Sequence, residues 1–160
     1  MILIKNGTII DPSCKREEKG DLLIADGKIA RIAPCGEIQE VGCEVIDATG
    51  MVVAPGLVDV HVHFRDPGFT YKEDIDTGAQ AALQGGFTSV VLMANTKPVV
   101  DNEETLDYIL EKGKNTPIHV YSCASVSKGL QGKELVDMAL LYSKGAAGFT
   151  DDGIPLLDVD

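Results

Sequence analysis

A chain of 160 residues with 44% hydrophobic content is long enough for one well-packed core or for one and a half domains, which excludes a disordered or fibrous protein. Its 14 basic and 25 acidic residues give a net charge of −11, which disfavours nucleic acid and anionic membrane surfaces as partners. No apolar run approaches the roughly 18 residues of a membrane helix, so we expect a soluble protein.

The four cysteines form no Cys-x-x-Cys pair, which disfavours a structural zinc site or a redox motif. We expect four free thiols that serve as packing residues. The apolar start of the chain reaches Lys5 too early for a secretory signal peptide. These features predict a cytoplasmic location.

The first segment, residues 1–54, consists of short apolar runs separated by turn signals. An Asn-Gly pair at residues 6–7 follows the first run, and Thr-Gly at residues 49–50 separates the last two. Asp-Gly at residues 26–27 joins two runs and is a strong hairpin signal. We predict a small all-β domain with a structural role, whose strands are part of a sandwich that later chain completes.

From residue 55 onward, strand-like and helix-like segments alternate. We expect a first strand that ends in His61 and His63, later strands over residues 87–93, 118–122 and 146–150, and helices over residues 71–84, 101–112 and 133–142, the second capped by Asp101. Such regular alternation favours right-handed βαβ units on a parallel sheet.

Two architectures fit four strand and helix units: an open doubly wound sheet, and half of an eight-stranded (β/α)8 TIM-type barrel. No Gly-x-Gly-x-x-Gly motif supports a dinucleotide site. Polar residues follow the carboxyl ends of three strands, which is where barrels hold their chemistry. We therefore predict that residues 55–160 form the first four βα units of a barrel and that the remaining strands lie beyond residue 160.

Two histidines at the end of the first barrel strand are candidates for metal ligands. Alternate side chains of a strand share a face, so His61 and His63 point the same way. Zinc accepts imidazole nitrogen and carboxylate oxygen, and either Asp151 or Asp152 at the end of the fourth strand would add a carboxylate. The alternatives are rim histidines and a turn with two solvated acids, and the common position at strand ends favours the metal.

Three further polar residues follow or lie within the predicted strands. Arg65 shares the histidine face if the backbone stays extended, and its planar guanidinium suits a substrate carboxylate, with a surface salt bridge as the alternative. Asn95 either caps a turn or binds substrate. His119 is expected to be a hydrogen-bonded core or rim residue.

Longer motifs surround these residues: APGLVDVHVHFRDPG at 54–68, YKED at 71–74, TG at 77–78, GGFT at 85–88, MANTKP at 93–98 and GFTDDG at 148–153. Together they resemble the bacterial type I dihydroorotases of the amidohydrolase superfamily, and the resemblance runs through the whole chain. Hydantoinases and allantoinases of the same superfamily carry a carboxylated lysine where this chain has an aspartate. One departure is Ala94, where the dihydroorotases usually have proline.

The resemblance implies a metal-dependent hydrolase barrel with two zinc ions. His61 and His63 would bind one zinc, and Asp152 would bridge to the second. Arg65 and Asn95 would hold the substrate carboxylate, with His63 also at the substrate. The resemblance places two more zinc histidines and the aspartate that acts as general acid and base beyond residue 160, so no catalytic residue of that kind is expected within this chain.

The implied activity is the reversible cyclisation of N-carbamoyl-L-aspartate to L-dihydroorotate in de novo pyrimidine biosynthesis. The implied partners are this small-molecule substrate and either a second copy of the chain in a homodimer or aspartate transcarbamoylase. Two alternatives stay open. Another cyclic amidohydrolase is disfavoured by the aspartate in place of lysine, and a non-catalytic dihydroorotase-like scaffold subunit is disfavoured by the retained ligands.

Overall fold

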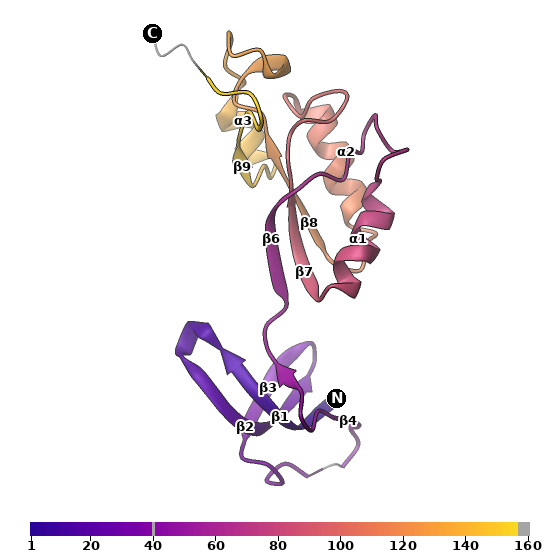
Figure 1. The fold of residues 1–160 in the computed structure, drawn as a ribbon, viewed down its shortest axis with the longest axis vertical. Helices are drawn as coiled ribbons and strands as arrows, with labels where there is room; N and C mark the ends of the chain where they lie inside the picture. The colour runs from indigo at the N-terminus through magenta and orange to yellow at the C-terminus, as the bar shows by residue number, and fades with distance from the viewer. Residues whose placement is uncertain (40, 157–160) are drawn as a thin grey trace. The chain divides into compact units, whose positions relative to one another are not determined.

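The computed structural model describes residues 1–39 and 41–156. The chain divides into two compact units, Met1–Pro55 and Gly56–Asp160. Strands form the first unit, and parallel strands alternate with helices in the second (Figure 1). No helix in the described part of the chain is long and apolar enough to cross a membrane.

The first unit is a single mixed sheet, in the order β3-β2-β1-β4 with β5 also paired to β1. The antiparallel hairpin between β2 and β3 turns at Asp26 and Gly27, which both have positive φ, so the predicted hairpin is confirmed. β4 and β5 run parallel to β1. The bounds are β1 Ile2–Asp11, the short 3-10 turn η1 Pro12–Cys14, β2 Arg16–Ala25, β3 Lys28–Ala33, β4 Glu44–Asp47 and β5 Val52–Val53. A second layer of a sandwich is not among the described residues.

The second unit is a parallel sheet in the order β6-β7-β8-β9. Each strand pairs with the next one along the chain, whereas a doubly wound sheet reverses its order at a switch point. This order confirms the first half of a TIM-type barrel. Its elements are β6 Leu57–Val62, α1 Ile75–Gln84, β7 Phe87–Leu92, α2 Glu103–Gly113, β8 His119–Ala124, η2 Lys128–Leu130, α3 Met138–Ser143 and β9 Gly148–Phe149.

All three helices of the second unit begin later than predicted. Each begins directly after a residue with a side-chain oxygen that accepts a helix N–H: Asp74 before α1, Asn102 before α2 and Asp137 before α3. Asp101 was the predicted cap of α2, which is wrong because its carboxylate instead accepts the N–H of Gly129. Residues 71–74, 101–102 and 133–137 therefore precede the helices rather than open them.

The core of the second unit lies between the sheet and its helices, which Figure 1 shows along one face of β6 to β8. Val90 and Leu92 of β7 pack there with Leu106 and Ile109 of α2. On β8, His119 and Tyr121 point away from the helices and are exposed. A half barrel has this property, because the opposite face would be the barrel interior.

The four cysteines are free thiols, as expected. Their predicted role as packing residues is wrong for Cys14 and Cys35, which are exposed. Cys43 does pack against the small core of the first unit, around Leu3. Cys123 is partly buried, and burial raises the pKa of its thiol.

Candidate metal site

His61, in β6, and His63, directly after its carboxyl end, lie side by side. Their ring centroids are 5.2 Å apart in an edge-on arrangement. Asp152, just beyond β9, faces both rings. Its Oδ1 lies 3.2 Å from Nε2 of His61 and its Oδ2 lies 3.5 Å from Nε2 of His63. The structure thus brings three potential ligands from two strand ends to one point.

The neighbouring aspartates 151 and 152 have different surroundings. Asp151 is only 9% exposed, and its Oδ1 accepts the backbone N–H groups of Val126 and Ser127 at 2.8 and 3.1 Å. The Ser127 hydroxyl donates to the other oxygen. These bonds occupy the Asp151 carboxylate and tie the end of β9 to the loop after β8. Of the two candidates that the sequence left open, Asp152 is therefore the one that meets the histidines.

Asn95 lies at the centre of the site rather than capping a turn. Its Oδ1 is 3.0 Å from Nδ1 of His63 and 3.5 Å from Nη1 of Arg65, and its Nδ2 donates to Oδ2 of Asp152 at 3.1 Å. The turn after Asn95 is closed by the Thr96 hydroxyl, which donates to a backbone carbonyl. The turn-cap alternative is thus wrong.

Arg65 reaches the site by a different route from the one predicted. β6 ends at Val62, and Arg65 has a left-handed φ of 51°, so the backbone is not extended there. The loop that carries Arg65 contacts the loop that carries Asn95: the Lys97 N–H donates to the Pro67 carbonyl, and Gly68, with φ +96°, leaves no room for a Cβ beside Lys97. Contact between the loops, rather than the strand period, brings the guanidinium beside Asn95.

Sequence reasoning missed the buried carboxylate that anchors this loop. Asp66 is fully buried and accepts hydrogen bonds from Tyr108 Oη at 2.9 Å, Lys112 Nζ at 2.7 Å and the N–H of Ile75 at 3.3 Å. The hydrogen bond to Asp66 raises the pKa of Lys112, and burial together with the same carboxylate raises the pKa of Tyr108. Tyr108 and Lys112 are four residues apart on α2 and so share one face of the helix. This spacing was the only feature of the sequence that could have indicated a common partner for the two side chains.

A divalent cation fits the donor set of His61, His63 and Asp152. Two ligand atoms about 2.1 Å from a tetrahedral zinc lie about 3.4 Å from each other. Each histidine Nε2 has an Asp152 oxygen at a similar distance, Oδ1 at 3.2 Å for His61 and Oδ2 at 3.5 Å for His63. The three ligand atoms all lie within 4.8 Å of one another, and within residues 1–39 and 41–156 no other such group occurs. Two imidazoles and a carboxylate are ligands that zinc accepts.

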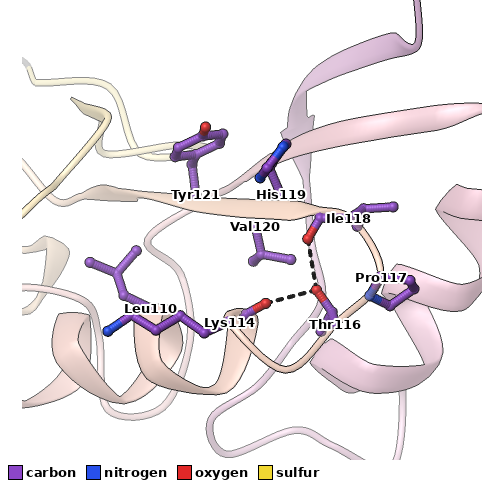
Figure 2. Close-up of a pocket in the computed structure, with 9 residues that line it drawn as sticks. Leu110, Lys114, Thr116, Pro117, Ile118, His119, Val120 and Tyr121 are labelled. Carbon is purple, nitrogen blue, oxygen red and sulfur yellow. Dashed lines mark hydrogen bonds between the residues drawn. The ribbon is translucent and has the colours of Figure 1, made fainter. Parts of the chain in front are cut away.

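A pocket at the opposite end of β8 is separate from this site. Figure 2 shows Lys114, Thr116, His119 and Tyr121 among its lining residues. His119 is exposed and packs beside the Tyr121 ring, so it belongs to the rim and not to the core. Barrels hold their chemistry at the carboxyl ends of the strands, and this pocket lies at the amino end of β8.

Known proteins resemble this chain in sequence and in fold. The family model described as Dihydro-orotase-like matches residues 50–158. A dihydroorotase of Clostridioides difficile is 60% identical over 99% of this chain, and one of Clostridium acetobutylicum is 54% identical over 99%. The chain spans 37% of the length of each. Among solved structures, an L-hydantoinase (dihydropyrimidinase) from Arthrobacter aurescens has a TM-score of 0.69 and 27% identity, over 92% of this chain and 32% of that one. The chain therefore belongs to the dihydroorotase-like family of the amidohydrolases.

Proposed function

We propose that the protein is a dihydroorotase, which interconverts N-carbamoyl-L-aspartate and L-dihydroorotate with zinc in pyrimidine biosynthesis. The observation that carries this proposal is the meeting of Asp152 with His61 and His63. An aspartate at this point matches the bacterial type I dihydroorotases that the chain resembles, whereas hydantoinases and allantoinases have a carboxylated lysine there. The 60% identity to a dihydroorotase supports the same reading. This chain spans 37% of the length of that relative.

His61, His63 and Asp152 would hold the zinc, with Asp152 shared with a second ion. When bound, zinc supplies a Lewis acid that polarises a carbonyl oxygen and lowers the pKa of water. The three side chains are 54%, 29% and 21% exposed and lie at the carboxyl ends of the strands, where barrels bind their substrates.

Arg65 and Asn95 would bind the carboxylate that dihydroorotate and carbamoyl-aspartate share. The guanidinium donates through a planar fork that matches a carboxylate, and the Asn95 amide lies beside it. In a chain with a net charge of −11, this arginine is a local positive charge for an anionic substrate. His63, next to Asn95, would then contact the dihydroorotate ring. Because Arg65 would hold the substrate in one orientation, attack on its amide would be effectively unimolecular.

The test measures zinc content and the hydrolysis of dihydroorotate, hydantoin and allantoin by the full chain. We expect dihydroorotate to be hydrolysed, the activity to be lost with a chelator, and zinc to restore it. Hydrolysis of hydantoin or allantoin instead would indicate another cyclic amidohydrolase. A well-folded full chain that is inactive and binds no zinc would indicate a scaffold subunit, and sedimentation with and without aspartate transcarbamoylase would test the predicted partners.

A further inference from the structure

The amide of Asn95 contacts three groups of the site at once. Its Oδ1 lies 3.0 Å from His63 Nδ1 and 3.5 Å from Arg65 Nη1, and its Nδ2 lies 3.1 Å from Asp152 Oδ2. Binding a substrate carboxylate does not require the contacts with His63 and Asp152. They therefore call for a separate explanation.

The chemistry of the three neighbours determines which end of the amide faces which group. A guanidinium can only donate hydrogen bonds, so Arg65 must face the amide oxygen. An ionised carboxylate can only accept them, so Asp152 must face the amide NH2. Because the oxygen also faces His63, the hydrogen of that imidazole must be on Nδ1 for a hydrogen bond to form. The Nε2 of His63 then turns its lone pair toward Oδ2 of Asp152 at 3.5 Å, and a cation bound between the two would remove their repulsion.

The backbone presents this amide in a fixed place. Asn95 lies between Ala94, which is fully buried, and Thr96, which is 7% exposed. The Ala94 carbonyl accepts the N–H of Thr96 at 2.9 Å and that of Val100 at 3.1 Å. The Thr96 hydroxyl closes the same turn onto the Pro98 carbonyl. A closed turn of this kind can hold the neighbouring groups in register, because it is itself held by several bonds.

We propose that Asn95 is a positioning residue for the metal ligands, in addition to any contact with substrate. It holds His63 in the tautomer whose Nε2 can bind a metal, and it orients the Asp152 carboxylate toward the same point. The inference rests on the proposed function, since it takes His61, His63 and Asp152 as the zinc site. Partners of this type, one shell outside the ligands, typically change metal affinity by about 10- to 100-fold when they are removed.

The first measurement is zinc affinity of the full chain, by competition with a chromogenic chelator. Asn95→Leu keeps the branched shape at Cγ but has neither hydrogen-bonding end, and we expect it to bind zinc about 10- to 100-fold more weakly. Arg65→Lys is the matched control, because it keeps the charge and changes the third contact of Asn95. We expect it to raise KM for dihydroorotate while zinc affinity stays within about twofold of wild type.

The second measurement is the tautomer of His63 in the zinc-free chain, from the nitrogen-15 chemical shifts of the imidazole. We expect Nδ1 to be protonated in wild type and in Asn95→Asp, which keeps an acceptor oxygen for His63. We expect a mixture of tautomers in Asn95→Leu, or in Asn95→Ala should the leucine variant fail to fold. A merely structural residue would not produce this pattern.

The two proposals fail in different ways. If wild type binds zinc and Asn95→Leu binds it equally tightly, with the same tautomer and only a raised KM, then Asn95 is a substrate residue alone and the inference is overturned. If wild type itself binds no zinc, both the proposed function and this inference are refuted.

Discussion

The buried carboxylate of Asp66 gives the sharpest prediction about stability. It joins the loop after β6 to α2 through the Lys112 ammonium at 2.7 Å and the Tyr108 hydroxyl at 2.9 Å. Asp66 is fully buried, whereas the Lys112 side chain is 29% exposed and has a second carboxylate, Asp76, at 3.4 Å. The two halves of this ion pair are therefore unequal, and their variants should differ.

Breaking a buried ion pair from one side typically costs about 3–5 kcal/mol, because the partner is left as an uncompensated charge. Lys112→Met leaves the fully buried Asp66 unpaired, and we expect a loss of about 3.5 kcal/mol in the free energy of unfolding. Asp66→Asn leaves Lys112 near solvent and Asp76, so a smaller loss of about 2.5 kcal/mol is expected. The double variant should lose only about 4 kcal/mol, a coupling of about 2 kcal/mol, because neither charge is then stranded.

Urea unfolding followed by the helical circular dichroism signal measures these differences, since the described α-helices all belong to the second unit. Asp76→Asn is the matched control: its side chain is 62% exposed, and such pairs contribute about 0.5 kcal/mol or less. Additive losses in the double variant, or a Lys112→Met variant as stable as wild type, would refute the assignment of Asp66 as the anchor of this loop.

Three further predictions follow from individual residues. Asp152→Asn should lower zinc affinity with little change in Tm, whereas Asp151→Asn should lower Tm by disrupting the loop after β8; calorimetry with a zinc titration separates them, and equal effects would contradict their different surroundings. Gly68→Ala should lower Tm and weaken dihydroorotate binding, because the added Cβ would lie 2.1 Å from the Lys97 carbonyl oxygen. Gly86→Ala is the control: Gly86 also has a positive φ, but a Cβ there would have nothing within 4 Å, so Tm should change less and binding should stay unchanged. A hydrogen bond from a backbone N–H of α1 lowers the pKa of Asp74 in the folded protein below its ordinary value of 3.8. The charged cap therefore stabilises the fold fully above pH 3.8, and this stabilisation is lost as the pH falls through the pKa of the folded state. The urea midpoint of Asp74→Asn should accordingly depend less on pH in the acid range than that of wild type.

What the sequence predicts well in this chain depends on local periodicity. The side-chain period of two places His61 and His63 on one face, and the Asp26-Gly27 pair demands the positive φ values of a hairpin turn. The alternation of strands and helices gives the parallel sheet, and the polar residues at strand ends give the site. The shared face of the histidines and the hairpin turn are each specified by neighbouring residues, whereas the sheet and the site follow from a pattern that extends along the second unit.

Features that depend on a choice between similar neighbours were not predictable in this way. Asp and Asn both cap helices well, so the sequence does not decide between Asp101 and Asn102. Asp101 is not the cap because its carboxylate accepts the N–H of Gly129, which lies far along the chain. The bond between Asp66 and Lys112 spans 46 positions, and no local pattern specifies it. The left-handed backbone of Arg65 likewise follows from how its loop is anchored, not from its own propensity.

The pair of aspartates at the end of β9 shows why the site itself depends on such distant bonds. Asp151 and Asp152 are chemically identical, so only their partners separate an anchor from a candidate ligand. Asp151 is fixed by the loop after β8, and Asp152 meets the two histidines at the end of β6 and the Asn95 amide from the loop after β7. Three strand ends must therefore be in register before the two carboxylates differ. A substitution that loosens any one of these loops should affect zinc binding through Asp152 even when all of the proposed ligands are retained.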